Sequence, residues 1–178
     1  FFDAEDNGDL DGWDYIAGSR AFARDLQEKP EKVVIVDMIG DADQQIYLDL
    51  NSDPALAAQL WQIAADLGYG QQFIPLPKYA MYDDHTPFAE LGIPAVDVID
   101  FDYPHWHTAQ DTLDKLSPDS LQRVGRVLQA WLETVGSGQW TVCPLPTDPK
   151  LAQSAIFGYY YRVLCPAPIT RLPGFCRI

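Results

Sequence analysis

The hydrophobic positions along the chain fall into patterns that predict its strands. An unbroken β-branched run at 33–36, Val-Val-Ile-Val, predicts a strand covered on both faces, as in parallel or mixed sheets. Apolar stretches at 93–99 and 72–74 predict two further strands. The sequence therefore predicts an α/β fold, with a central, mostly parallel or mixed sheet flanked by helices.

Two long helices are predicted from their end signals and apolar faces. Asp53-Pro54 supplies an N-cap and a first-turn proline, and Gly68 supplies a stop. The expected buried face of this helix consists of Leu56, Leu60, Ile63, Ala64 and Leu67. Ser117-Pro118 begins the last helix and Gly136 ends it. Its expected buried face consists of Leu121, Val124, Leu128, Trp131, Leu132 and Val135.

The sequence also predicts two short helices and a fold that is incomplete at its N-terminal side. Ser19 is expected to cap a helix that runs to about Leu26, and Thr86 to cap one that ends near Gly92. The chain opens without Met on Phe1-Phe2, which we interpret as the end of a buried strand. We therefore expect a fragment whose fold is incomplete at its N-terminal side, and any targeting signal would lie upstream.

Composition narrows the classes of partner. The formal net charge of −14 argues against nucleic acid and anionic membrane as partners, because both are negatively charged. The same charge is compatible with a metal cation or an amine-bearing substrate. No apolar run reaches the roughly 18 residues that a membrane span needs. Oligomeric state does not follow from the sequence.

The composition changes near residue 139. Residues 139–178 contain all three cysteines, Cys143, Cys165 and Cys176, and are rich in proline, with more basic than acidic residues. Three cysteines cannot all pair with one another, and their spacing matches no metal site. We expect 139–178 to be a tail of uncertain structure without a catalytic part.

Several acidic residues stand where α/β folds place ligand sites. Asp3, Glu5 and Asp6 lie close together, and like charges at such spacing share protons or face a cation. Asp37 directly follows the buried strand at 33–36, at the carboxyl end where ligands bind in open sheets. The alternatives are a solvated acidic loop for the first group and a turn-capping role for Asp37.

Two later segments could supply partners for these carboxylates. Asp83, Asp84 and His85 precede a helix, and the alternative is a cap with a surface ion pair. The loop at 100–108 follows a predicted strand and combines two carboxylates, two imidazoles and an indole, among them Trp106 and His107.

Taken in order, five segments resemble one superfamily. They are Phe-Phe-Asp-Ala-Glu-Asp, Gly-Ser-Arg, Val-Asp-Met-Ile-Gly, Asp-Asp-His-Thr-Pro-Phe and Trp-His-Thr-Ala-Gln-Asp-Thr-Leu-Asp-Lys. The superfamily is that of the zinc-dependent exopeptidases, which include bacterial aminopeptidases and glutaminyl-peptide cyclotransferases. The resemblance covers about residues 1–135, so we interpret 1–138 as the C-terminal portion of a zinc exopeptidase-like catalytic domain.

The resemblance implies a role for each matching residue. Glu5 corresponds to the carboxylate that acts as general base and then general acid, with Asp83 as a second catalytic carboxylate. Asp6, where the family usually has Glu, and His107 correspond to zinc ligands. Asp37 corresponds to a ligand of a second zinc in the peptidases or to a hydrogen-bonding carboxylate in the cyclases. The residues implied to bind substrate are Trp106, Asp84 and His85.

These roles imply a zinc-dependent aminopeptidase-like hydrolase that acts on peptide N-termini, with one or two zinc ions. The alternative is a glutaminyl-peptide cyclotransferase, which converts N-terminal Gln to pyroglutamate, and a third possibility is a non-catalytic binding module on the same fold. The family takes further zinc ligands from a segment before Glu5, so we expect this chain alone to bind zinc poorly and to be inactive. Relatives are often secreted or periplasmic, and this is an analogy only.

Overall fold

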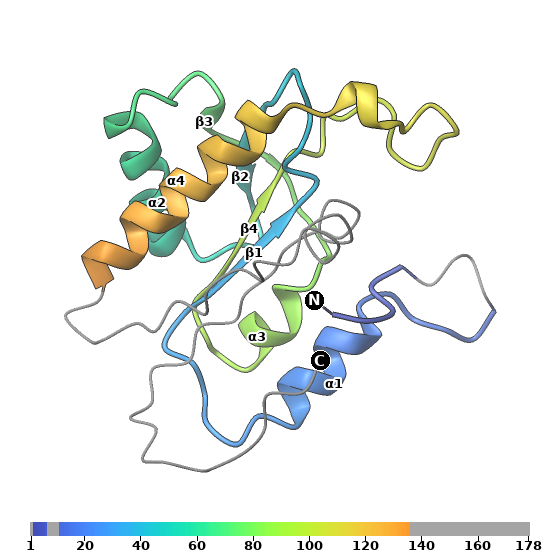
Figure 1. Cartoon of the computed structure of the whole chain (residues 1–178). Coiled ribbons are helices and arrows are strands. Elements are labelled where there is room, and N and C mark those ends of the chain that lie inside the picture. Colours follow the sequence, from blue (N-terminus) through green and yellow to red (C-terminus); the bar gives the residue numbers. More distant parts are fainter. Residues whose placement is uncertain (1, 7–10, 136–178) are drawn as a thin grey trace, which may run out of the picture.

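The computed structural model describes residues 2–6 and 11–135. Helices and strands are interspersed along this part of the chain (Figure 1). In order they are α1 (Ala17–Arg24), β1 (Val33–Asp37), β2 (Ile46–Asp49), α2 (Pro54–Asp66), β3 (Phe73–Tyr79), α3 (Thr86–Glu90), β4 (Ala95–Ile99), the 3-10 helix η1 (Leu113–Lys115) and α4 (Pro118–Val135). The predicted α/β class is confirmed.

The strands form two parallel ladders. β1 pairs with β4, with Val33 opposite Ala95 and Asp37 opposite Ile99. β2 pairs with β3, and the register shifts twice along this pair. Both ladders are parallel, as the β-branched run predicted.

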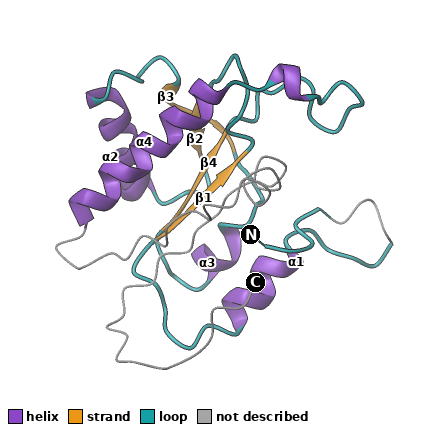
Figure 2. Ribbon diagram, viewed as in Figure 1, coloured by secondary structure: helices purple, strands orange, loops and turns teal. Residues whose placement is uncertain are grey.

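Helices cover both faces of the strands (Figure 2). Side chains alternate along β1, so Val33 and Ile35 pack with α1 and α3, whereas Val36 packs with α2 and α4. Each fully buried aliphatic side chain of this kind stabilises the fold by about 1.5–3 kcal/mol. This two-sided burial fixes the β1–β4 pair and therefore the direction in which its carboxyl end points.

The end signals of α2 act as predicted. The side chain of Asp53 accepts a hydrogen bond from the Leu56 N–H at 2.7 Å, and Pro54 is the first residue of the helix. Gly68 follows the helix with a φ of 86°, a conformation that glycine adopts without strain.

Three local predictions are wrong. Ser19 does not cap α1, because the helix begins two residues earlier, after Ile16 in the left-handed region. Thr86 is the first residue of α3, where its hydroxyl accepts the Asp83 N–H at 3.3 Å. Phe2 lies outside any strand, and its ring packs against Phe22 and Phe88.

Other differences concern the extent of burial and pairing. Leu121 is 47% exposed, and Val127 takes the buried place on α4 because that helix contacts its neighbours slightly off the predicted face. β2 was not predicted, and β3 extends well beyond 72–74 through Pro75 and Pro77. These prolines are tolerated because β3 pairs with β2 alone among the described strands.

The remaining predictions concern segments without a description. Residues 136–178, with the predicted tail, lie outside the described residues. Within the described part, no helix has the combined length and apolarity that a membrane crossing requires.

Candidate active site

The backbone of the Glu5 segment is fixed by the start of α1. The Ile16 N–H donates to the Glu5 carbonyl at 2.7 Å, and the Ala17 N–H donates to the Ala4 carbonyl at 3.0 Å. These donors are among the N–H groups that a helix leaves unsatisfied at its N-terminus. Glu5 therefore takes its place from tertiary contacts and not from a strand.

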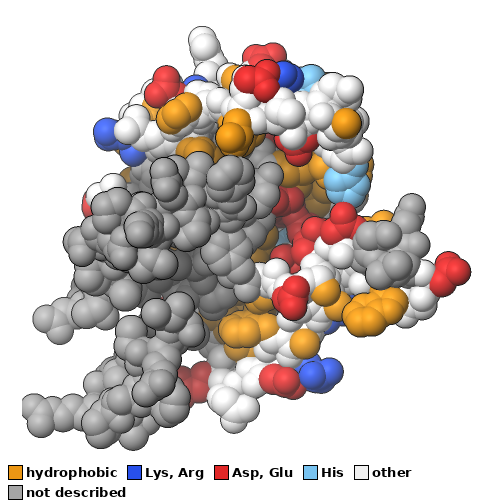
Figure 3. All heavy atoms as spheres, turned by 45° about the vertical axis from the view of Figure 1, so that its right-hand side comes forward, with side chains coloured by type: hydrophobic (Ala, Val, Ile, Leu, Met, Phe, Trp, Pro, Cys, Tyr) orange, Lys and Arg blue, Asp and Glu red, His pale blue; other side chains and the backbone are white. Residues whose placement is uncertain are grey.

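Carboxylates from two distant segments and from the neighbouring Asp6 lie near Glu5. Partial burial is the largest cause that raises the pKa of Glu5 to about 7, followed by the negative charges of Asp83, Asp37, Asp84 and Asp6. Glu5 keeps contact with solvent, so its desolvation is incomplete. Figure 3 shows acidic side chains gathered in a hollow on one face of the molecule, with an imidazole at its edge.

Asp83 holds a proton more readily than an ordinary aspartate. Burial, and then the charge of Asp37, raises the pKa of Asp83 to about 6, although the Asp84 N–H donates to its Oδ1 at 2.5 Å. Asp37 is the last residue of β1, which explains how it reaches this group. A carboxyl with a pKa near 6 or 7 can both accept and release a proton near neutral pH.

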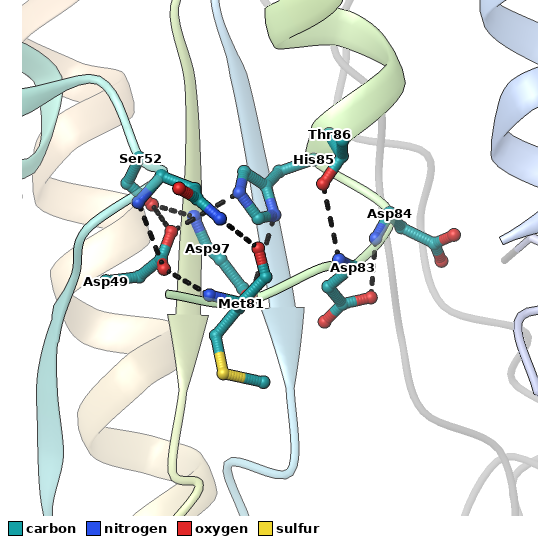
Figure 4. A network of polar contacts seen from close by, with 9 residues as sticks. Asp49, Ser52, Met81, Asp83, Asp84, His85, Thr86 and Asp97 are labelled. Carbon is teal, nitrogen blue, oxygen red and sulfur yellow. Dashed lines mark hydrogen bonds and ion pairs between the residues drawn. The ribbon is translucent and has the colours of Figure 1, made fainter. Parts of the chain in front are cut away.

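His85 is buried close to Asp83 and lies between two buried aspartates, Asp49 and Asp97 (Figure 4). Its Nε2 is 3.3 Å from Asp49 Oδ2 and its Nδ1 is 3.9 Å from Asp97 Oδ2, and none of its side chain is exposed. The Ser52 hydroxyl and the Met81 N–H each donate to Asp49 at 2.7 Å. His85 is therefore held inside the protein at a fixed depth.

The two aspartates beside His85 are shifted in opposite directions. Burial alone would raise the pKa of Asp49, but the His85 imidazole beside it and hydrogen bonds from the Met81 N–H and the Ser52 hydroxyl outweigh burial and hold that pKa below its usual value. Burial raises the pKa of Asp97 well above its usual value, and Asp83 adds to the rise. Asp97 is therefore the carboxyl of this group that retains its proton most readily.

A second imidazole, His107, lies at the surface beside Asp6. Its Nε2 is 3.4 Å from Asp6 Oδ2, and both side chains remain about half exposed. The exposed Trp106 ring stacks on His107, with ring centroids 4.2 Å apart and an angle of 27° between the planes. Asp6, His107 and Trp106 therefore place an accessible carboxylate, an imidazole and an aromatic surface next to one another.

Strained backbone accompanies these residues. Ala4, Met38 and His107 have φ values of 52°, 49° and 55°, in the left-handed region that non-glycine residues seldom adopt. Ala4 precedes Glu5 and Met38 follows Asp37. Such strain persists only where the surrounding structure enforces it, and it concentrates at functional sites.

The first 132 residues of the chain are similar to known proteins. The sequence pattern of Peptidase family M28 matches residues 1–132. The chain belongs to peptidase family M28. Among solved structures, it is similar to the glutaminyl cyclase of Porphyromonas gingivalis, with 32% identity and a TM-score of 0.69 over 76% of this chain and 55% of that one. It is also similar to a Zn-dependent exopeptidase of Parabacteroides distasonis, with 26% identity and a TM-score of 0.66 over 78% of this chain and 53% of that one.

A curated M28 relative shows how partial the match is. The glutaminyl-peptide cyclotransferase of Boiga irregularis is 31% identical over 58 residues, which are 32% of this chain and 16% of that protein. The chain thus matches about half the length of the solved structures and about a sixth of this relative. Both kinds of relative are enzymes, as is the M28 family as a whole.

The donor set fits part of the zinc site that the M28 relatives imply. Asp6 and His107 offer the oxygen and nitrogen donors that zinc prefers, and their side chains are accessible. A catalytic zinc site uses three protein ligands. Across residues 2–6 and 11–135, no three His, Cys, Asp or Glu side chains lie close enough together to hold one ion. The described part therefore supplies a pair of donors and not a complete set.

The predicted site residues of this M28 chain separate into two layers. Glu5, Asp6, Asp37 and Asp83 act on one another electrostatically, and Asp6 is near the exposed His107 and Trp106. Asp83, Asp84 and His85 are buried and form the lower layer. The expected contact of Asp84 and His85 with substrate stays a prediction.

Sequence reasoning missed two members of the lower layer, Asp97 and Asp49. Asp97 stands in the middle of β4, where all five residues are buried. A lone carboxylate inside an apolar strand is itself a signal, because buried charges are kept only with partners. Asp49 ends β2, a strand that the hydrophobic pattern did not reveal.

Proposed function

We propose that the protein is a glutaminyl-peptide cyclotransferase, which closes an N-terminal Gln to pyroglutamate and releases ammonia. The observation that carries the proposal is the grouping of Asp37 and Asp83 around Glu5, beside the Trp106–His107 stack. Cyclisation needs a group that moves a proton from the α-amine of the substrate to its own γ-amide nitrogen. It also needs hydrogen-bond acceptors that hold the amine. Solved glutaminyl cyclases are 26% to 34% identical to the chain, and the Zn-dependent exopeptidase is 26% identical, so sequence identity supports both kinds of enzyme.

The reaction assigns a task to each of these residues. The α-amine nitrogen of the substrate attacks its own γ-amide carbon, so a C–N bond forms in the ring. Glu5 takes a proton from that amine and delivers it to the amide nitrogen, whose bond to carbon then breaks to release ammonia. Asp37 and Asp83 accept hydrogen bonds from the amine and orient it.

The aromatic loop and the donor pair complete the proposal. Trp106 offers an exposed flat surface against which the Gln side chain can pack. Asp6 and His107 would hold zinc, which when bound polarises a carbonyl oxygen as a Lewis acid. His107 is kept in place for this by the stacked Trp106 ring.

A second candidate function is an aminopeptidase-like hydrolase. The similarity to the Zn-dependent exopeptidase, with a TM-score of 0.66 against 0.69, supports it nearly as well. In that reaction the proton acceptor Glu5 would act on water and not on the amine of the substrate. The same carboxylate therefore serves both candidates, and only the products distinguish them.

The products are measured with the intact protein, because this chain alone is expected to be inactive, and with two peptides that differ only at the first residue, Gln in one and Leu in the other. With zinc supplied, a cyclotransferase releases ammonia from the Gln peptide and no free amino acid from either. A Glu5→Gln variant should lower kcat by roughly 10²–10⁴-fold, whereas Glu28→Gln, a change at an exposed residue, should not. Free Leu or Gln would establish the hydrolase instead. Absence of any product would favour the non-catalytic binding module.

A further inference from the structure

Three consecutive residues of α1, Gly18, Ser19 and Arg20, contact both segments that carry the proposed proton-handling carboxylates. We call these three residues the α1 clasp. One of the segments, residues 3–6, contains Glu5, and the other, residues 82–85, contains Asp83. The proposed reaction assigns no task to the clasp, although it joins two stretches that are far apart in the sequence.

Gly18 allows the Glu5 segment to lie directly on the helix. A Cβ atom at Gly18 would be 1.9 Å from the Asp3 carbonyl oxygen and 2.7 Å from the Asp3 nitrogen. Both atoms belong to the backbone, so no side-chain rotation could relieve the overlap. The N–H groups of Ile16 and Ala17 hold the same segment through its carbonyls. Any side chain at Gly18 must therefore displace the segment that carries Glu5.

Arg20 binds the other segment. Its Nη2 donates to the Tyr82 hydroxyl at 2.8 Å, and Tyr82 directly precedes Asp83. Nη1 and Nη2 also donate to the two carboxylate oxygens of Glu90 in α3, at 2.8 and 3.2 Å. This two-pronged contact fixes the guanidinium geometry more tightly than a single ion pair would.

Ser19 lies between these two contacts. It is fully buried, and its hydroxyl donates to the Ile16 carbonyl at 3.1 Å. Burial raises the pKa of Asp84, and a hydrogen bond with Ser19 opposes that rise. Ser19 therefore lies close to the residue that follows Asp83.

We propose that the α1 clasp sets the position of Glu5 relative to Asp83, so that its three members are positioning residues for proton transfer. The inference rests on the proposed function for what the two carboxylates do. The placement itself can be measured without turnover. A displacement of about 1 Å can lower a rate by roughly 10²-fold, so a small shift of the Glu5 segment is enough to matter.

The direct test replaces Gly18 with alanine in the full chain and measures amide hydrogen exchange by NMR. Exchange at the Ile16 and Ala17 amides should speed up by roughly tenfold or more, because their acceptors are displaced. Gly125→Ala is the matched control, since Gly125 lies within α4 and a Cβ there would meet nothing within 4 Å. This control should leave both amides unchanged.

A second variant guards against misfolding of Gly18→Ala. Arg20→Gln removes the two-pronged contact at a partly exposed position, and Arg24→Gln in the same helix is its control. Arg20→Gln should speed exchange at the Asp83 and Asp84 amides, and Arg20→Lys should restore it only in part. Arg24→Gln should have no such effect.

Activity completes the test. In an enzyme that makes pyroglutamate, Gly18→Ala and Arg20→Gln should lower kcat while KM stays nearly constant, since misplaced carboxylates impair the transfer more than binding. Unchanged exchange in both variants would overturn the inference, as would changed exchange with an unchanged kcat. If the parent protein forms no pyroglutamate, the proposed function fails, and the exchange data alone then decide whether the clasp places the two segments.

Discussion

The protein contains two imidazole–carboxylate pairs of nearly equal length in opposite surroundings. In the buried pair, His85 Nε2 is 3.3 Å from Asp49 Oδ2, with side-chain exposures of 0% and 1%. In the surface pair, His107 Nε2 is 3.4 Å from Asp6 Oδ2, with exposures of 54% and 44%. The chemistry of the two pairs is the same, so any difference in role must come from their environment.

Burial or exposure to solvent decides whether an imidazole–carboxylate pair can give up its contact and bind a ligand instead. A buried charge that loses its partner remains without water, and such a loss is strongly destabilising. Exposed ions gain little from each other because water already solvates them. The buried pair therefore serves as scaffold beneath the carboxylate cluster, whereas the surface pair can give up its mutual contact for a ligand.

The largest expected effect comes from breaking the buried pair. His85→Leu leaves Asp49 and Asp97 without the imidazole and should lower the free energy of unfolding by about 3–5 kcal/mol. His107→Leu removes the equivalent group at the surface and should change it by about 1 kcal/mol or less. Urea unfolding of both variants measures the contrast. Equal losses would show that burial does not separate the two pairs.

A smaller effect is expected from pH. The pKa values of Glu5, Asp83 and Asp100 are raised to about 7, 6 and 6, chiefly by burial. The folded state therefore binds more protons than the unfolded state between roughly pH 4 and 7, so stability should fall as pH rises through this window. The lowered pKa values of Asp49 and Asp114 have the opposite sign and act at lower pH.

The pH prediction is checked by urea unfolding at pH 5 and at pH 7.5. The free energy of unfolding should be larger at pH 5, and Asp83→Asn should reduce the difference because it removes one of the raised groups. Asp114→Asn is the control, since that carboxyl pairs with Lys115 at the surface and its pKa is lowered to about 2. A stability that rises from pH 5 to pH 7.5 would contradict the assigned shifts.

The parts of the fold that the sequence predicted have local causes. The β-branched run at 33–36 and the Asp53-Pro54 helix start depend on residues that are neighbours in the chain. β2 escaped prediction because a short strand is stabilised mainly by the strand beside it. Val127 replaced Leu121 in the core because the rotation of a helix is set by what it packs against.

The sequence proposed members of the candidate site but not their depth. Asp37 was proposed because strand ends follow from the hydrophobic pattern, and Glu5, Asp6 and His107 because of the superfamily resemblance. Asp83, Asp84 and His85 all lie inside the protein. Depth depends on the packing of α1 and α3 around that segment, and no local pattern records it.

The most direct test of the account locates zinc in crystals of the intact protein by anomalous diffraction. The account predicts a peak bonded to the His107 imidazole and the Asp6 carboxylate, with the His85–Asp49 pair intact and free of metal. A peak between His85 and Asp49, or one that touches neither Asp6 nor His107, would contradict the assignment of the surface pair as the metal donors.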